Sequence, residues 1–274
     1  MTATTAPAPS RSPRPDRVDA GGVLRSEWTK LRSVRSTWWT LAATFGTMVG
    51  FGALFSAAFV ARYDRLDPGE RLRIDPTLHS LRGIYLAQLA IGVLGVLAIT
   101  NEYATGMIRN TFASVPQRHA VLLAKAAIFG LMALIVGLAA SFTAFFIGQS
   151  ILSQKHVQAA IGDPGVLRAV IGGGCYLAGI GILGLGLGAL LRRTAGAIAT
   201  LFGAVLVFPA LAEALPSPWN VDVQKVLPGV AGQAILNVRH ASDALSPLTG
   251  FALFVGYVVV VFALAVVSVR RRDA

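Results

Sequence analysis

The residues that could do chemistry by type are few in this sequence and stand far apart. The four histidines are scattered over polar segments, without an H-E-x-x-H motif or a paired Asp/Glu cluster, so no metal site is predicted. The single cysteine, Cys175, lies in an apolar run and cannot form an intrachain disulfide. The sequence contains no G-x-S-x-G motif and no Cys-His pairing. We therefore predict no catalytic residue. The histidines are His79, His119, His156 and His240.

Glycine-rich motifs raise the question of nucleotide binding. Gly179, Gly181 and Gly184 match the dinucleotide fingerprint G-x-G-x-x-G, but no strand precedes them and no acidic residue follows about 20 residues on. Gly184 and Gly188 instead form G-x-x-x-G, which lets helix backbones approach closely in lipid. We assign these two glycines to helix packing, within the subunit or at a dimer seam. No G-x-x-x-x-G-K-[ST] phosphate loop is present, so we predict no bound cofactor and no ATP site in this chain.

The composition is that of an integral membrane protein. Of 274 residues, 54% are hydrophobic and 14% charged, against about 25% charged in a soluble domain. About 20 apolar residues are needed to cross a bilayer. We predict an all-α membrane protein with six transmembrane helices, the fifth closed early by Pro209 and Glu213. The six segments are 38–60, 83–100, 121–148, 169–191, 195–212 and 249–269.

The net charge of +11 indicates a lipid membrane rather than nucleic acid as the partner. The basic residues flank the apolar segments and do not form a separate basic domain. With the N-terminus inside, 15 of the 24 lysines and arginines fall on the inner side. The outer segment 61–82 is the exception, because acidic residues nearly balance its arginines. We predict a multi-pass protein of the cell membrane with both termini cytoplasmic.

An amphipathic helix is predicted before the first span. Residues 1–22 lack the apolar core of a signal peptide and are predicted to form a disordered cytoplasmic tail. Over 23–37, apolar residues recur at steps of three and four, which is typical of a helix lying in the membrane interface. Arg35 is expected to mark the turn into the first span. The apolar stripe is Leu24, Trp28, Leu31, Val34 and Trp38, with Arg32 on the basic side.

A polar segment, residues 101–118, connects the second and third spans on the inner side. Asn101 is a suitable N-cap, Glu102 is favourable at a positive helix start, and Pro116 would stop the helix. We predict a short amphipathic helix that starts near Tyr103 and lies across the membrane surface; an ordinary charged loop is the alternative. The apolar side would be Met107, Ile108, Phe112 and Val115.

Ionisable residues are absent from three of the six predicted spans. The first, second and sixth contain no Asp, Glu, Lys, Arg or His, whereas an ion-coupled transporter normally keeps an ionisable group in the membrane. Energy for any transport must therefore come from elsewhere, and a separate ATPase subunit would supply it. In the long outer loop 213–248 we predict short helices over 223–227 and 233–239, which are too short to cross the membrane.

These features resemble the membrane permease subunits of type 2 ABC transporters (the ABC-2 family), notably an actinobacterial-like branch. Residues 24–33 look like the family's cytoplasmic elbow before span 1. Glu102-x-x-x-Gly106-Met107-Ile108-Arg109, followed by Pro116-x-Arg118 and Lys125, looks like the signature of its coupling helix, which docks into a groove of the ATPase. Met107 departs from the threonine common after that glycine.

The resemblance implies roles for individual residues. Glu102, Arg109 and Arg118 would make polar contacts with the ATPase. Met107, Ile108 and Phe112 would fill its groove. The chain would be the permease subunit of an ATP-driven exporter and not itself an enzyme, working as a homodimer or with a related permease. The alternatives are a non-transporting six-span scaffold or sensor and, third, an intramembrane enzyme.

Overall fold

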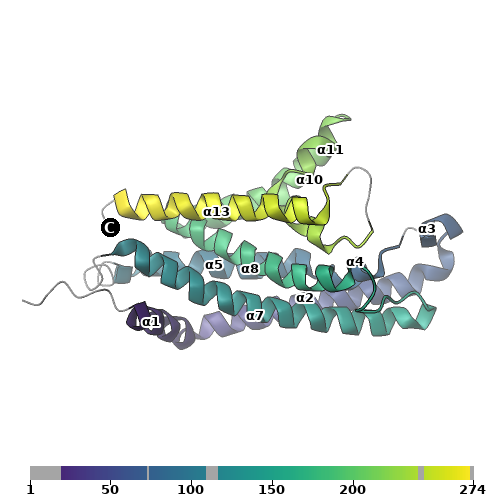
Figure 1. Cartoon of the computed structure of the whole chain (residues 1–274), viewed down its shortest axis with the longest axis horizontal. Coiled ribbons are helices and arrows are strands. Elements are labelled where there is room, and N and C mark those ends of the chain that lie inside the picture. The colour runs from purple at the N-terminus through teal and green to yellow at the C-terminus, as the bar shows by residue number, and fades with distance from the viewer. Residues whose placement is uncertain (1–19, 73, 109–116, 240–243, 272–274) are drawn as a thin grey trace, which may run out of the picture.

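The computed structural model describes residues 20–72, 74–108, 117–239 and 244–271, and within these ranges the chain forms helices and turns without a β-strand. Six helical segments are long and apolar enough to cross a membrane, which confirms the predicted all-α, six-span fold. They run side by side, with α1 and the C-terminus at one end and α3 and α4 at the other (Figure 1). We call these the α1 end and the far end. The segments are Arg35–Arg65, Ile84–Ala104, His119–Lys155, Val166–Leu191, Thr194–Glu213 and Pro247–Arg271.

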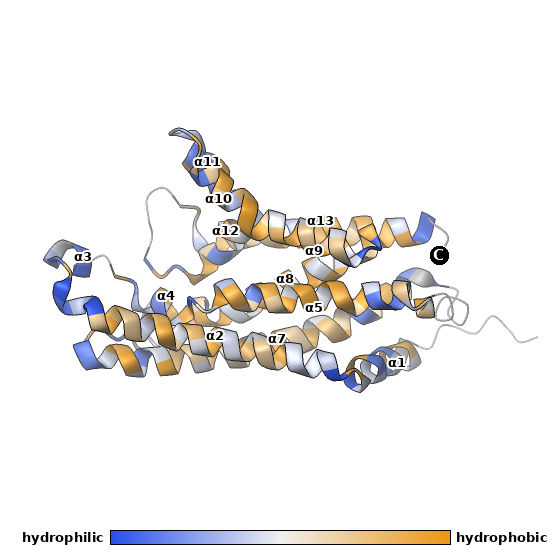
Figure 2. Ribbon diagram, turned by 180° about the vertical axis from the view of Figure 1, so that it is seen from behind, coloured by the Kyte–Doolittle hydropathy of each residue, from blue (hydrophilic) through white to orange (hydrophobic). Residues whose placement is uncertain are grey.

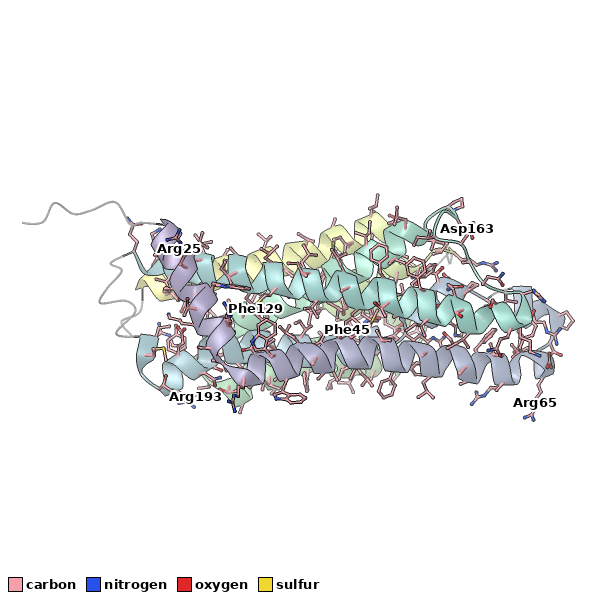
Figure 3. The ribbon with its side chains drawn as sticks, turned by 90° about the horizontal axis from the view of Figure 1, so that it is seen from below. Arg25, Phe45, Arg65, Phe129, Asp163 and Arg193 are labelled. Atoms are coloured by element: carbon pink, nitrogen blue, oxygen red, sulfur yellow. The ribbon has the colours of Figure 1, made fainter. Side chains whose placement is uncertain are left out.

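The side chains follow the same division. Hydrophobic residues dominate the middle of the long helices, and hydrophilic residues gather at their two ends (Figure 2). Arg25 and Arg193 mark the α1 end, and Arg65 and Asp163 mark the far end (Figure 3). A bilayer favours this distribution, because charged groups remain in water or at headgroups while the apolar stretches meet lipid.

A break at Val34 separates the first two helices. The helix α1 (Ala20–Ser33) ends before Val34, whose backbone is extended (φ −88°, ψ 109°), and α2 (Arg35–Arg62) starts immediately after it. The helix predicted over 23–37 is therefore divided, because residues 35–37 belong to the first span. Of the predicted tail, residues 20–22 form the first turn of α1, and the rest lies outside the described residues.

Short elements at the far end join the first two spans. A 3₁₀ turn, η1 (Tyr63–Arg65), is followed by α3 (Pro68–Leu72) and α4 (Pro76–Leu81), and then by α5 (Ile84–Ala104). The Asp75 side chain caps α4 by accepting a hydrogen bond of 3.1 Å from the backbone N–H of Leu78. Its other oxygen accepts one of 3.0 Å from the N–H of Val238. Asp75 thus ties together two outer connections far apart in the sequence.

The helix α8 (Val166–Leu191) is central in the bundle. It follows α7 (Arg118–Leu152) and a 3₁₀ turn, η2 (Ser153–Lys155). In its most apolar stretch 72% of the residues are buried, against 22% in each of the first, fifth and sixth spans. The fifth span is α9 (Thr194–Phe202), a π-helical turn η3 (Gly203–Val207) and α10 (Phe208–Glu213). From α10 to α11 the chain leads away from the bundle (Figure 1).

The last outer connection differs from its prediction. Its helices are α11 (Trp219–Gln224) and α12 (Pro228–Gln233), followed by a 3₁₀ turn, η4 (Ala234–Leu236), and α13 (Pro247–Arg271). The helices predicted over 223–227 and 233–239 are misplaced. Proline explains the difference: Pro218 directly precedes α11 and Pro228 is the first residue of α12, where its missing N–H and fixed φ favour a helix start.

Glycines let α5 and α8 approach until their backbones touch. A Cβ added to Gly184 would overlap the carbonyl oxygen of Gly92, and one added to Gly95 would overlap that of Gly181. A Cβ on Gly188 would lie 2.7 Å from Cγ2 of Ile99. Gly184 and Gly188 therefore lie at the α5–α8 contact, where a side chain would force the helices apart.

The substitution Gly184→Ala should lower the stability of the protein by about 1–3 kcal/mol, as expected for overpacking. Gly196→Ala in α9 is the matched control, because an added Cβ there has no neighbour within 4 Å and alanine favours a helix. Thermal unfolding in detergent measures both variants. Equal melting temperatures for the two would contradict the packing role of Gly184.

His79, in α4, is a half-buried group at the far end. Its ring centroid lies 4.6 Å from that of Phe59, and within the described structure its Nδ1 is buried without a hydrogen-bond partner. Burial and then the Arg82 charge lower the pKa of His79 from 6.5 to about 4, against an opposing effect of Asp75. In the unfolded chain the imidazole therefore takes up its proton at a higher pH than in the folded protein.

This difference predicts a pH dependence. As the pH falls from 6.5 to about 4, the unfolded state binds the His79 proton first, so the folded state loses stability across this window. The variant His79→Phe keeps the ring stacking and removes the titration. Its melting temperature should fall less than that of the wild type between pH 7 and about 4.5. Parallel pH profiles would rule out this assignment.

Candidate functional site: a buried charge cluster at the α1 end

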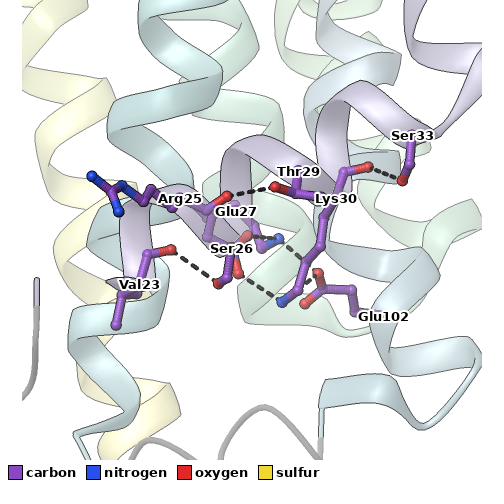
Figure 4. Close-up of polar contacts among 9 residues, drawn as sticks. Val23, Arg25, Ser26, Glu27, Thr29, Lys30, Ser33 and Glu102 are labelled. Carbon is purple, nitrogen blue, oxygen red and sulfur yellow. Dashed lines mark hydrogen bonds and ion pairs between the residues drawn. The ribbon is translucent and has the colours of Figure 1, made fainter. Parts of the chain in front are cut away.

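Four charged side chains from three helices meet inside the α1 end, and we call them the charge cluster. Lys125 of α7 lies at the centre: its Nζ is 2.5 Å from Oε2 of Glu27 in α1 and 2.8 Å from Oε1 of Glu102 in α5. Lys30, one turn after Glu27, places its Nζ 2.7 Å from Glu27 Oε1 and 3.4 Å from Glu102 Oε1. Figure 4 shows Glu27, Lys30 and Glu102 turned toward one another.

Three of the four members of the cluster are almost entirely removed from solvent, whereas the side chain of Lys30 is 27% exposed. The side chain of Lys125 is 1% exposed, that of Glu27 is 0% exposed and that of Glu102 is 9% exposed. Among the described residues two carboxylates face two ammonium groups. Burial of an ion costs several kcal/mol, and only close pairing with opposite charges offsets that cost. Each member of the cluster therefore requires the others to remain in place.

The charge cluster fixes which side of α1 faces the bundle. Glu27 and Leu31, one turn apart, are buried, and α1 packs mainly on α7. Leu24 and Trp28 are 36% and 41% exposed. The apolar stripe predicted for this helix therefore divides in the structure, because Leu31 turns inward while Leu24 and Trp28 remain on the surface. That exposed side is the one available to lipid.

The residues around the Val34 break lie at the surface. Arg32 is exposed, and Trp38 is 49% exposed. The indole N–H of Trp38 donates a hydrogen bond of 3.1 Å to the carbonyl oxygen of Arg32. This bond spans the break and fixes the direction in which α2 leaves α1.

Taken together, the acidic partners of Lys30 raise its pKa more than burial lowers it. Burial by itself would lower the pKa of this ammonium group, but the hydrogen bond to Glu27 and the charges of Glu102 and Glu27 raise it overall. Lys30 therefore keeps its charge at neutral pH.

The N-cap predicted at Asn101, with a new helix from about Tyr103, is wrong, because α5 continues through Ala104. The N–H of Thr105 donates to the carbonyl oxygen of Asn101 at 3.0 Å, as in a continuing helix. Gly106 then adopts a positive φ of 69°, a left-handed conformation that glycine accepts without strain and that commonly ends helices. Glu102 thus lies in the last turns of α5, and its carboxylate is placed by Lys125 rather than by a helix start.

The remaining residues predicted to dock an ATPase have different environments. Met107 is 45% exposed, whereas Ile108 is 3% exposed and packs into the core. Ile108 and Glu102 are therefore unavailable to a partner in this conformation. Arg118 is the first residue of α7. Arg109, Phe112 and Pro116 lie outside the described residues.

A groove of about 380 Å³ adjoins the charge cluster. Residues of α1, α2 and α5 form its walls, among them Leu31, Thr37 and Leu94, and Lys30, Glu102 and Met107 line it as well. The groove combines an apolar wall with charges of both signs. Met107, which lies shortly after the end of α5, lines this groove together with members of the charge cluster.

The chemistry available at this site is ionic pairing. Among the described residues no group of three or more His, Cys, Asp or Glu could hold a metal ion. Comparison with protein-family models returns no match, and neither does comparison with curated proteins. The geometry therefore carries the functional argument.

Removal of the central ammonium group, that of Lys125, should strongly destabilise the protein. Lys125→Met leaves the carboxylates of Glu27 and Glu102 buried beside an apolar side chain, which should destabilise the protein by about 3–5 kcal/mol. The control, Lys225→Met, breaks an exposed 2.6 Å pair with Asp222 and should cost less than about 1 kcal/mol.

Thermal unfolding in detergent, with limited proteolysis of the α1 region, measures both variants. Adding Glu27→Gln to Lys125→Met should restore part of the stability, because one buried carboxylate is then neutral. If Lys125→Met were as mild as Lys225→Met, the charge cluster would not hold α1 in place.

Proposed function

We propose that this chain is the permease subunit of an ATP-binding cassette exporter, driven by a separate ATPase subunit that binds at the α1 end. The observation that carries the proposal is the contact of Lys125 with both Glu27 and Glu102. These residues join α1 to α5 and α7, the two helices on either side of the connection 105–117. A push on that connection would therefore reach three helices at once.

The packing of the helices determines how a movement at the connection 105–117 would be transmitted. Close-packed helices move as rigid bodies between discrete arrangements. The charge cluster links α1, α5 and α7, and the glycine contacts link α5 to α8. Movement of a docked ATPase would thus be passed to the centre of the bundle and not absorbed by a loose loop.

The distribution of charge supports docking at the α1 end. Arg25, Lys30, Arg32 and Arg35 lie there, as do the residues at the ends of α8 and α13, Arg192, Arg193, Arg270 and Arg271. Such an excess of positive charge is typical of the cytoplasmic side of a membrane protein. An ATPase is cytoplasmic, so we place both termini and the connection 105–117 on that side of the cell membrane.

A second permease subunit would complete the transporter. The first, fifth and sixth spans are only 22% buried, and their outer faces are apolar. Lipid and another copy of this chain, or a related permease, would cover those faces. In this proposal substrate moves along the seam between the two permease subunits.

Two substitutions in the connection 105–117 test the docking. Met107→Glu and Phe112→Asp should each reduce the ATPase recovered with the tagged, membrane-inserted chain by about tenfold or more, as expected for the centre of an interface. Val221→Glu, an apolar-to-acidic change on α11 at the far end, should leave the recovery unchanged. The readout is stoichiometric co-purification of an ATP-binding subunit together with ATP hydrolysis.

Two results would contradict the proposal. One is ATP hydrolysis by the purified chain alone. The other is equal ATPase recovery with all three variants. A wild-type chain that inserts correctly but never recovers an ATPase would favour the non-transporting scaffold or sensor.

A further inference from the structure

A second cleft lies toward the far end of the bundle, away from the charge cluster. Its volume is about 470 Å³. One wall comes from the fifth span, where the π-helical turn η3 and Pro209 interrupt the regular helix, and α12 supplies another wall. Such π-helical turns occur frequently at functional sites. The lining residues are of two kinds: Val205, Leu206, Ala210 and Val230 are apolar, and Tyr85, Gln224, Gln233 and Asn237 are polar.

A buried polar network adjoins this cleft through Gln233. The Tyr176 hydroxyl donates to Oε1 of Gln88 at 2.5 Å. Nε2 of Gln233 donates to the same oxygen at 3.2 Å and to the Tyr176 hydroxyl at 3.3 Å. Gln233 also lines the cleft. Its Nε2 is used inside the network, while its Oε1 accepts no hydrogen bond within the described chain.

Among the described residues that line this cleft, Glu213 is the only Asp, Glu, Lys, Arg or His. It is the last residue of α10, and within the described structure its carboxylate has no hydrogen bond or ion pair. By contrast, the groove beside the charge cluster carries Lys30, Glu102 and Lys125. The cleft at the far end therefore combines an apolar surface, an unpaired negative charge and the acceptor oxygen of Gln233.

From this combination we infer that the cleft binds an amphipathic organic cation, such as a protonated amine with an apolar body. The apolar body would displace water from Leu206, Ala210 and Val230. The ammonium group would donate hydrogen bonds to Glu213 and to Oε1 of Gln233. An anionic ligand would meet the unpaired carboxylate and be excluded. This inference builds on the proposed function, because it names the chemical class of the exported substrate.

Three matched fluorescent probes test the inference on the full chain in nanodiscs of neutral phosphatidylcholine. The probes are dansylcadaverine, which is cationic, its neutral N-acetyl derivative and the anionic dansyl-6-aminohexanoate. Fluorescence titration, corrected with empty nanodiscs, gives the affinities. We expect the cation to bind most tightly and the anion least.

Variants locate the binding. Glu213→Gln should weaken binding of the cation by about threefold or more and bring its affinity to that of the neutral probe. The control Asp222→Asn changes the net charge equally on the adjacent α11, outside the lining of the cleft, and should have no effect. Ala210→Phe, which fills the cleft from an exposed helix position, should weaken binding of both the cationic and the neutral probe.

The inference is overturned if no probe binds, if the preference for the cation survives Glu213→Gln, or if Asp222→Asn has the same effect. It is likewise overturned if Ala210→Phe leaves binding unchanged. The assay contains no ATPase. A failure of ATPase co-purification would therefore remove the proposed function without altering these affinities, and a failure of probe binding would leave the docking at the α1 end intact.

Discussion

The pairing of Lys125 with two buried carboxylates is the constraint on which the α1 end depends. An ammonium group taken out of water loses several kcal/mol of hydration free energy, and nearby opposite charges in a medium of low dielectric constant recover it. The two carboxylates, Glu27 and Glu102, come from different helices. If α1, α5 or α7 moved away from the other two helices, a buried charge would lose its partner of opposite sign. The short helix α1 is therefore part of the bundle and not a loose attachment to it.

Hydropathy predicted the number and the order of the spans because each span must be apolar over about 20 residues. It placed the ends of several spans less well. The second span was predicted to stop at Thr100, but α5 continues to Ala104 because Lys125 accommodates Glu102 in its last turns. The third was predicted to start at Val121, whereas α7 begins at Arg118. Pairing between helices, which a single-segment pattern does not contain, accounts for the longer α5.

The role of Glu27 was missed for the same reason. It lies three residues after Leu24 and four before Leu31, so it falls on the predicted apolar stripe, although its partner Lys125 is 98 residues away in the sequence. An acid on that stripe and a lysine inside an apolar run were the available signals of a buried pair. Gly106 was likewise a helix-ending signal, but a new helix was predicted to start before it, near Tyr103.

The helix α5 physically connects the two ends of the molecule. Gln88 belongs to the polar network at the cleft and Glu102 to the charge cluster. Glu102 is 14 positions after Gln88, which corresponds to about 21 Å of helix. Between these positions, Gly92 and Gly95 allow α5 to pack closely against α8. The helix α8 also carries Tyr176 of the same polar network. A displacement of α5 at the charge cluster would therefore strain the α5–α8 contact and the hydrogen bonds of Gln88 together. Because close-packed helices resist gradual deformation, such a displacement would be transmitted along the bundle to the wall of the cleft.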